Sequence, residues 1–268
     1  MIRFDELQNL ASDWQIPIET AEKDYCLTWL LIGLAQTPLR ETFVFYGGTA
    51  LKKMWFPDYR FSEDLDFMIR YPLDRPQLTA RITEALQTAS QNINITFDLD
   101  KDTTIFREDR WQGFITYSGY GEISAIKQIK IDILQEYDRA QPPLKRPVLS
   151  PYRDTRNMSA QLDVCTLETI FSDKLATLIS PTRTEPRDVY DLWALSAGEK
   201  IDTKQIKENF KYTTGYYPDW PMIKSSLNNP LYAERWNIRL KHQIPDLPDY
   251  STILIEITSR LKNMFNKL

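Results

Sequence analysis

Histidine and cysteine are scarce in this chain of 268 residues, which contains one histidine (His242) and two cysteines (Cys26 and Cys165). A single histidine takes Ser-His-Asp and Cys-His catalysis out of contention. It also leaves too few ligands for a metal site made of cysteine and histidine. The two cysteines lie far apart in apolar contexts, so we predict buried thiols that form no disulfide in a reducing compartment.

Long apolar stretches are also missing. No apolar run reaches the ~18 residues that a membrane-spanning helix needs, and the first residues lack the basic-then-apolar pattern of a secretory signal. We therefore expect a cytoplasmic protein with no membrane partner. Hydrophobic residues make up 42% of the chain and charged residues 26%, without a low-complexity tract. This composition predicts a folded chain of one large or two small domains.

Neither positive nor negative residues are in large excess, because the net charge is only −4. The charge is uneven, however: residues 1–199 carry a net charge of −8 and residues 200–268 carry +4. A mildly basic C-terminal third is compatible with a nucleic-acid contact. It is equally compatible with an ordinary helical surface, and both interpretations stay open.

Two glycines end a short β-prone run, Phe43–Tyr46. Glycine at 47 and 48 lets the backbone turn sharply or a ligand come close, because no Cβ blocks either. Thr49 is placed to cap a helix starting at Ala50, whose N–H groups and positive dipole end would point at whatever lies over the glycines. The pattern predicts a phosphate-binding turn, although Gly-Gly alone is more often an ordinary turn.

Two aspartates share one face of the next predicted strand. Asp64 and Asp66 are two residues apart, so both point one way while Leu65 and Phe67 point into the core. Neighbouring carboxylates repel unless a cation lies between them, and Mg²⁺ prefers such hard oxygen ligands together with substrate phosphates. An isolated Asp-x-Asp is usually a solvated strand face, so the spacing after Gly-Gly is what favours a metal site.

A third carboxylate lies on a later strand. Ile129, Ile131 and Ile133 alternate with Lys130 and Asp132, which places the last two on one face. A half-exposed strand could simply present these two side chains to water. After the first two motifs, however, the metal-binding or catalytic interpretation of Asp132 is favoured.

The second half of the chain is predicted to be helical. The proline-rich, basic segment from Gln141 to Pro151 marks a domain boundary, which gives an expected first domain at 1–140 and a helical domain at 141–268. The basic linker is a candidate polyanion contact, or simply a solvated connector. Helices are expected at Leu167–Ile179, Arg187–Leu195, Lys204–Tyr212, Trp220–Leu227, Leu231–Leu240 and Thr252–Phe265.

Several basic side chains could either bind phosphate or have a structural role. Lys52 and Lys53 lie one turn beyond the glycines and could reach a phosphate, but we expect solvated surface lysines. Lys174 lies beside an apolar helical stripe, where an ammonium needs an anion, such as Asp188 or Asp191. Asp188 near a helix N-terminus is favoured by the helix dipole alone.

Together these motifs resemble the nucleotidyltransferase core of the DNA polymerase β type. Tyr46–Leu51 with Arg60–Phe67 is similar to the AbiEii group of nucleotidyltransferase toxins, from abortive-infection (phage-defence) and toxin–antitoxin systems. Three further segments also resemble motifs of that group, namely Glu22–Tyr25, Asp173-Lys174 and Arg187–Leu192. The group's Gly-Ser turn is Gly-Gly here, and residues after 200 match no motif.

The resemblance implies an α+β fold: a mixed sheet of about five strands with flanking helices, then an α-helical C-terminal domain, with the active site between them. It implies transfer of a nucleoside monophosphate from an NTP, with Mg²⁺ or Mn²⁺ as cofactor. The implied roles are nucleotide binding by Gly47, Gly48, Thr49 and Ser62, metal binding by Asp64, Asp66 and Asp132, and catalysis by these three carboxylates with Lys174, Arg187 and Asp188.

The resemblance further implies a growth-arresting toxin that modifies tRNA 3′ ends and is neutralised by a cognate antitoxin protein. Two alternatives stay open. The first keeps the fold but transfers the nucleotide to a Ser, Thr or Tyr hydroxyl of a protein. The second is a binding module without catalysis, against which the intact Asp64, Asp66 and Asp132 argue. The sequence does not indicate which NTP is used.

Overall fold

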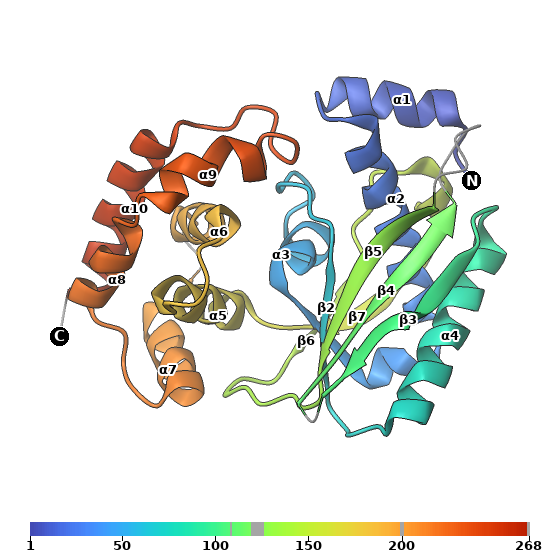
Figure 1. The fold of residues 1–268 in the computed structure, drawn as a ribbon, viewed down its shortest axis with the longest axis horizontal. Helices are drawn as coiled ribbons and strands as arrows, with labels where there is room; N and C mark the ends of the chain where they lie inside the picture. The colour runs from blue at the N-terminus through green and yellow to red at the C-terminus, as the bar shows by residue number, and fades with distance from the viewer. Residues whose placement is uncertain (108, 119–125, 199–200, 267–268) are drawn as a thin grey trace. The chain divides into compact units, whose positions relative to one another are not determined.

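The computed structural model describes residues 1–107, 109–118, 126–198 and 201–266 (Figure 1). The chain divides into two compact units. The first contains Met1–Tyr137 and Pro143–Val164, and the second contains Asp138–Pro142 and Cys165–Leu268. Among the described helices, none combines the length and apolar character needed to cross a membrane.

The first unit is built on a seven-stranded mixed sheet with the strand order β3-β4-β5-β2-β1-β7-β6. β2 runs parallel to β5 and β1 parallel to β7, and the other neighbours are antiparallel. This confirms the predicted α+β class with a mixed sheet. The strands are β1 (Phe43–Tyr46), β2 (Leu65–Ile69), β3 (Phe97–Phe106), β4 (Arg110–Ser118), β5 (Ile126–Leu134), β6 (Leu144–Pro147) and β7 (Gln161–Val164).

The expected count of about five strands is wrong, because β6 and β7 lie in and after the proline-rich segment. β6 occupies part of the stretch that we expected to be a linker, and it pairs antiparallel with β7. β7 in turn pairs with the central strand β1. A proline is tolerated at an edge strand, where one side of the backbone needs no ladder partner.

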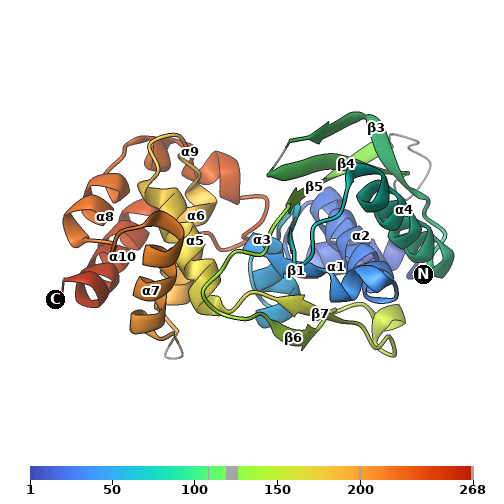
Figure 2. The same cartoon turned by 90° about the horizontal axis from the view of Figure 1, so that it is seen from below.

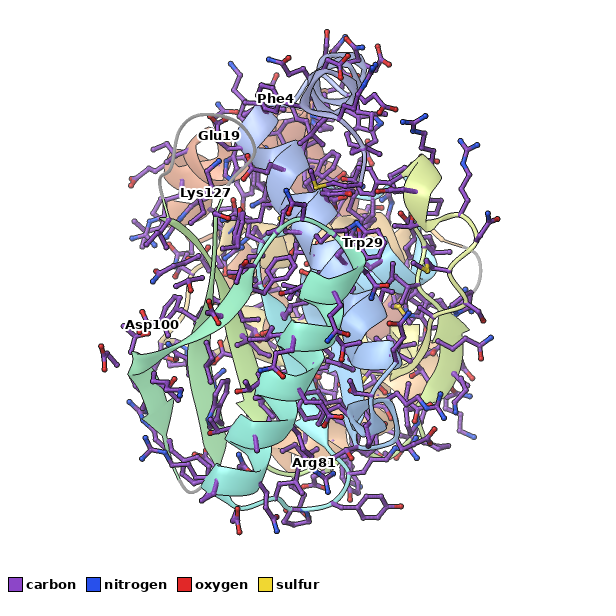
Figure 3. All side chains as sticks on the ribbon, turned by 90° about the vertical axis from the view of Figure 1, so that its right-hand side faces the viewer. Phe4, Glu19, Trp29, Arg81, Asp100 and Lys127 are labelled. Carbon is purple, nitrogen blue, oxygen red and sulfur yellow. The ribbon has the colours of Figure 1, made fainter. Side chains whose placement is uncertain are left out.

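One face of the sheet is apolar and is covered by helices. α2 (Ile18–Ala35) and α4 (Arg75–Asn92) lie side by side against it, as Figure 3 shows around Trp29 and Arg81. Their apolar side chains meet those of the strands around a small apolar void. α1 (Phe4–Asp13), the short 3-10 helices η1 (Pro38–Glu41) and η3 (Arg153–Thr155), the single turn α3 (Gly47–Ala50) and the π-helical turn η2 (Leu51–Trp55) complete this unit.

The opposite face of the same strands is polar. Ile129, Ile131 and Ile133 of β5 are buried, so the alternation of a strand turns Lys130 and Asp132 to the other face. The register carries this face across the sheet, because Asp132 is level with Asp66 on β2. The face opposite the hydrophobic core therefore carries Asp66 and Asp132 on two neighbouring strands.

The second unit is helical, as predicted (Figure 2). Its amphipathic helices bury residues at regular spacing, for example Ile253, Ile257, Leu261 and Phe265 of α10. The helices are α5 (Leu167–Ile179), α6 (Pro186–Ser196), α7 (Thr203–Thr214), α8 (Trp220–Leu227), α9 (Leu231–Leu240) and α10 (Tyr250–Phe265). Their bounds follow the predicted ranges closely.

Candidate active site

The two glycines form a sharp turn between β1 and α3, which we call the glycine turn (Gly47 and Gly48). Gly47 has a φ of +80°, a conformation that a Cβ disfavours. A Cβ built on Gly47 would also lie 2.6 Å from Oδ2 of Asp66. Position 47 therefore requires glycine on two independent grounds, and the second places a predicted catalytic carboxylate directly against the turn.

Gly48 is covered by the segment that leads to β2. A Cβ at this position would lie 2.6 Å from Nη2 of Arg60 and 3.3 Å from Oγ of Ser62. Arg60 is buried, and its Nη1 donates a hydrogen bond of 3.1 Å to the carbonyl oxygen of Phe61. Ser62 thus lies beside the glycine turn, where nucleotide binding was predicted. Arg60, which received no role from the sequence, lies there as well.

Thr49 does not cap a helix, which corrects the prediction. The helical turn already begins at Gly47, with Tyr46 as its N-cap. The buried hydroxyl of Thr49 instead donates a hydrogen bond of 2.5 Å to the carbonyl oxygen of Asp64. The side chain could not be assigned from local sequence because its acceptor lies 15 residues further along. The bond ties the glycine turn to the start of the Asp-x-Asp strand.

Strand register brings two of the three predicted carboxylates together. Tyr46 pairs with Asp66 across β1 and β2, and Asp66 pairs with Asp132 across β2 and β5. Paired residues on neighbouring strands present their side chains on the same face. We call Asp66 and Asp132 the carboxylate pair. Asp64 lies just before β2 and is half-buried, like Asp66.

Asp132 is buried among positive charges. Its Oδ2 lies 2.5 Å from Nζ of Lys130, and its Oδ1 lies 3.4 Å from Nε of Arg110 on β4. Oδ1 nevertheless makes no hydrogen bond within the described part of the chain. A buried carboxylate oxygen without a hydrogen bond is costly unless a further cation or donor completes it. Asp132 therefore has unused capacity to bind a ligand.

These groups fit a divalent metal that is shared with a substrate. Among the described residues, no three aspartate, glutamate, histidine or cysteine side chains are grouped to hold a metal by themselves. Mg²⁺ does not require that, since one or two carboxylates plus substrate phosphates usually bind it. The carboxylate pair and the unsatisfied Oδ1 of Asp132 supply hard oxygen donors of the right kind.

Two predicted catalytic residues of the second unit, Lys174 and Asp188, form an ion pair. Nζ of Lys174 lies 2.6 Å from Oδ1 of Asp188 and 2.9 Å from Oδ2 of Asp191. Both aspartates are buried, and Nε of Arg183 lies 3.3 Å from Oδ2 of Asp188. Lys174 thus has both of the anions that the sequence suggested. Nε of Arg187 lies 3.9 Å from Oε2 of Glu185.

The lysines after the glycine turn are not solvated surface residues, which corrects the prediction. Lys53 is fully buried, and its Nζ donates to Oδ2 of Asp24 at 2.6 Å and to Oγ1 of Thr28 at 2.8 Å. The hydroxyl of Tyr152 donates to the same Asp24 oxygen at 2.7 Å. Burial lowers the pKa of Lys53, and the Asp24 carboxylate opposes that shift. This buried network anchors η2 to α2.

Lys52 is buried too, and it spans the loop after η2. Its Nζ donates to the carbonyl oxygens of Pro57 at 3.2 Å and Tyr59 at 2.9 Å. The ammonium also lies 4.0 Å from the centroid of the Phe61 ring. Burial lowers the pKa of Lys52 to about 8. Lys52 therefore fixes the path of the loop that delivers Arg60 and Ser62 to Gly48.

Both cysteines are buried and no disulfide joins them, as predicted. Burial raises the pKa of the Cys26 thiol, with nearby Glu22 adding to the shift. A buried thiol with a raised pKa is a poor nucleophile. Cysteine chemistry therefore has no part in the candidate site.

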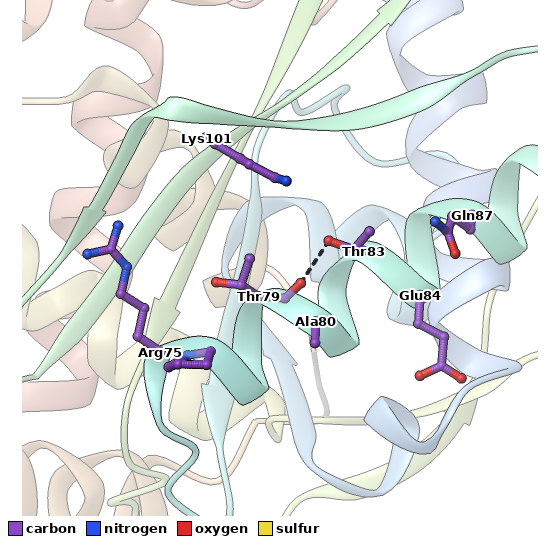
Figure 4. Close-up of a pocket in the computed structure, with 8 residues that line it drawn as sticks. Arg75, Thr79, Ala80, Thr83, Glu84, Gln87 and Lys101 are labelled. Atoms are coloured by element: carbon purple, nitrogen blue, oxygen red, sulfur yellow. Dashed lines mark hydrogen bonds between the residues drawn. The ribbon is translucent and has the colours of Figure 1, made fainter.

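A groove elsewhere in the first unit holds none of the predicted site residues. It has a volume of about 540 Å³ and lies between α4 and β3 (Figure 4). Thr79, Thr83 and Gln87 line it from the helix, and Lys101 reaches over it from β3. No carboxylate pair faces it, so the glycine turn and the polar sheet face remain the candidate active site.

Arg110 and Arg60 are the site residues that sequence reasoning missed. Arg110 lies 22 positions before its partner Asp132 in a different strand, so only the register of β4 and β5 brings them together. Arg60 lies within the quoted motif, and its position between the glycines and the aspartates was the available signal. Lys130 was recognised only as a neighbour of Asp132.

Comparisons with known proteins agree with this geometry. The family model described as "Nucleotidyl transferase AbiEii toxin, Type IV TA system" matches residues 29–261. No curated protein sequence gives a significant match. A similar solved structure is MenT4, a nucleotidyltransferase toxin from Mycobacterium tuberculosis H37Rv, with a TM-score of 0.67 and 18% identity over 100% of this chain and 91% of that one. The fold is thus shared with MenT4, and the chain belongs to the AbiEii family of nucleotidyltransferase toxins of type IV toxin–antitoxin systems.

Proposed function

We propose that this toxin transfers a nucleoside monophosphate from an NTP to a hydroxyl of RNA, with the 3′ end of tRNA as the acceptor. The observation that carries the proposal is the register of Asp66 and Asp132 on neighbouring parallel strands, with Asp66 against Gly47. Phosphoryl transfer needs little covalent chemistry from the protein. It depends mainly on positioning and charge neutralisation.

In this proposal the glycine turn, Thr49 and Ser62 hold the triphosphate. Buried Arg60 keeps Ser62 and Gly48 in place, because its guanidinium packs on both the glycine and its own loop. The hydrogen bond from Thr49 to the Asp64 carbonyl fixes the turn relative to the carboxylates. The protein groups that hold the phosphates are thus already ordered before the substrate binds.

Asp64, Asp66 and Asp132 hold Mg²⁺, or Mn²⁺, together with the phosphates of the NTP. When bound, the metal polarises the transferred phosphoryl group and neutralises charge on the leaving pyrophosphate. Asp132 also accepts the proton of the attacking hydroxyl as general base, or orients that hydroxyl. Lys130 and Arg110 orient the Asp132 carboxylate through their ion pairs with it.

Lys174, Arg187 and Asp188 are proposed to act in the same reaction. Lys174 and Arg187 neutralise phosphate charge, and Asp188 orients Lys174 through their 2.6 Å ion pair. Arginine offers a planar fork that binds phosphate in a bidentate manner, which lysine cannot copy. Replacement of Arg187 by lysine is therefore expected to impair transfer more than a like-charge exchange on a solvated surface does.

The biological setting follows from the family and is part of the proposal. Expression of the chain alone arrests growth in the cytoplasm, a cognate antitoxin relieves the arrest, and phage defence is the context in which the system acts. The family's description as a type IV toxin–antitoxin system supports the antitoxin. The net charge of +4 on residues 200–268 favours a polyanionic acceptor such as RNA over a protein.

The decisive experiment replaces Asp66 by asparagine, which keeps size and removes charge. The purified chain is incubated with each labelled NTP, Mg²⁺, tRNA and a cell extract, and the label is followed on gels that separate RNA from protein. We expect label on RNA from the native chain and a rate at least about a hundredfold lower with Asp66→Asn. Asp98→Asn on β3, an exposed carboxylate of the same sheet, is the matched control.

Each possible outcome decides between the alternatives. Wild-type transfer by folded Asp66→Asn would remove the proposed mechanism. Label on protein in place of RNA would establish the protein-hydroxyl alternative on the same site. No transfer with any NTP, under conditions where the chain arrests growth, would favour a binding module without catalysis.

A further inference from the structure

Three tyrosines are exposed within six residues of the second unit. Tyr212 lies in the last turn of α7, and Tyr216 and Tyr217 follow the C-cap Gly215. The three side chains are 55%, 45% and 47% exposed, respectively. We call them the tyrosine patch. Aromatic rings of this size are normally buried for more of their area, and the candidate active site does not use them.

The rings of the patch are held in place by local contacts. Gly215 ends α7 with a φ of +85°, and its N–H bonds to the carbonyl oxygen of Lys211 at 2.8 Å. This turn brings Tyr216 back against the buried Phe210, edge-on at a centroid distance of 5.5 Å. Rings that are already oriented lose little entropy when a ligand stacks on them.

Tyr217 is fixed on the surface of α7. Its hydroxyl donates to Oε1 of Glu208 at 3.0 Å, and Nζ of Lys211 lies 4.5 Å from its ring centroid. The Lys211 ammonium lies over one face of the Tyr217 ring. Another aromatic ring, such as a base, can then stack on the rest of the exposed ring surface. The 47% exposure of Tyr217 agrees with a ring that is covered on one side only.

The charge around the patch suits an anion. Lys204, Lys207 and Lys211 lie on α7, whose helix carries one acid, Glu208. Glu208 is occupied by the Tyr217 hydroxyl, and Asp202 accepts from the backbone N–H groups of Lys204 and Gln205 as the N-cap. Within α7 itself the lysines therefore outnumber the acids, three to one.

We infer that the tyrosine patch with Lys204 and Lys211 binds single-stranded RNA, stacking unpaired bases on the rings while the lysines contact the phosphates. Every base offers a π-face, so such a platform tolerates sequence, whereas a duplex hides its base faces. The inference deepens the proposed function, because an unpaired 3′ end is the proposed acceptor. It rests on that proposal only for the role of the RNA, not for its binding.

The test measures binding separately from chemistry. The full chain is titrated into a fluorescein-labelled, unpaired 12-nucleotide RNA, and into the same strand in a duplex, with anisotropy as the readout. We expect Tyr217→Ala to weaken single-strand binding about tenfold and the Tyr216→Ala, Tyr217→Ala double variant to weaken it further. Tyr217→Trp should restore binding. Tyr71→Ala, which removes a more exposed tyrosine of the first unit, should leave binding unchanged.

Charge is tested by salt dependence. Lys211→Gln is expected to reduce the slope of log affinity against log salt by about 0.7, the value for one lost contact with a single strand. Circular dichroism and thermal unfolding confirm that each variant is folded. Wild-type affinity in the folded double variant, an equal loss in Tyr71→Ala, or preference for the duplex would overturn the inference.

Transfer assays with the same variants separate this inference from the proposed function. If the native chain binds single strands through the patch but labels only protein, the patch stands and the RNA acceptor does not. If the patch variants label RNA with an unchanged KM, the function stands and the patch is not the acceptor surface. Self-association of the native chain that the tyrosine variants abolish would assign the patch to a protein contact instead.

Discussion

Gly47 shows how a glycine can be required both by its backbone conformation and by the space that a neighbouring side chain occupies. Its φ of +80° disfavours any side chain, and its missing Cβ leaves room for Oδ2 of Asp66 at what would be 2.6 Å. Conformational strain alone would reduce stability without touching the chemistry. Contact with Asp66 would displace a carboxylate of the proposed site. The two effects can be separated because the chain contains a second glycine with the same conformation.

We predict that Gly47→Ala lowers both stability and NTP binding, whereas Gly215→Ala lowers stability alone. Gly215 has a φ of +85°, and a Cβ there would meet nothing within 4 Å. Each substitution should cost about 1–2 kcal/mol in the free energy of unfolding, from backbone strain. Urea unfolding and calorimetric titration with NTP and Mg²⁺ measure the two quantities. Equal NTP affinity in the two variants would show that Gly47 is only a turn residue.

At the scale of elements, η2 and the loop after it form the frame of the glycine turn. Lys53 anchors η2 to α2 through Asp24, and Lys52 holds the loop through the carbonyl oxygens of Pro57 and Tyr59. Both lysine side chains are buried. Burial disfavours the charged form, so the pKa of Lys52 falls to about 8. We therefore expect the stability of this part of the fold to depend on pH.

We predict that the stability of the native chain rises relative to Lys52→Met between pH 8 and 10.5. Below about pH 8 the folded chain holds Lys52 charged at a desolvation cost, while the unfolded chain has an ordinary lysine with a pKa near 10.5. Between these values the unfolded state binds more protons, so the stability difference shifts in favour of the native chain, by up to about 3 kcal/mol. Urea unfolding across this window measures the shift.

Lys101→Met, which removes an exposed lysine of β3, is the control for this titration. Its stability is measured over the same pH window. If the native chain and Lys52→Met keep a constant stability difference from pH 7 to 11, the loop does not depend on a buried ammonium.

The elements were largely predictable, because their patterns are local. The isoleucines of β5 alternate with polar residues, and the helices of the second unit repeat their apolar positions every three or four residues. Two strands escaped prediction because β6 and β7 have four residues each and lie in and after the proline-rich segment. Such short strands depend on partners supplied by the rest of the sheet, and local propensity does not encode that.

The site was predictable where spacing decides the geometry and unpredictable where register or burial does. Asp64 and Asp66 were assigned to one face from their separation alone. Arg110 reaches Asp132 only through the register of β4 on β5. Lys53 was assigned to solvent because its partner Asp24 lies 29 residues earlier in another helix. Long-range ion pairs of this kind leave no mark in the local sequence.

At the scale of the whole chain, the first unit is not a continuous segment. Residues 143–164 belong to it although Asp138–Pro142 belong to the second unit. β7 pairs with the central strand β1, and Tyr152 completes the Asp24–Lys53 network. Arg146 donates to the carbonyl oxygen of Met54 at 2.8 Å, and its guanidinium lies 4.0 Å from the Trp55 ring centroid. The segment therefore supports both the sheet and η2.

We predict that the fragment Met1–Val164 unfolds cooperatively, whereas the fragment Met1–Ala140 does not. The shorter fragment loses β7, which leaves one edge of β1 without its ladder. It also loses Tyr152, so Oδ2 of Asp24 keeps Lys53 and loses its other short hydrogen bond. A buried charge with fewer partners costs several kcal/mol, which is comparable with the whole stability of a domain. Thermal unfolding followed by circular dichroism compares the two fragments, and Met1–Val164 with Tyr152→Phe isolates the hydroxyl from the strand. A cooperative transition of Met1–Ala140 at the same temperature as the longer fragment would mean that the first unit folds without residues 143–164. The domain boundary would then lie at the proline-rich segment that the sequence suggested.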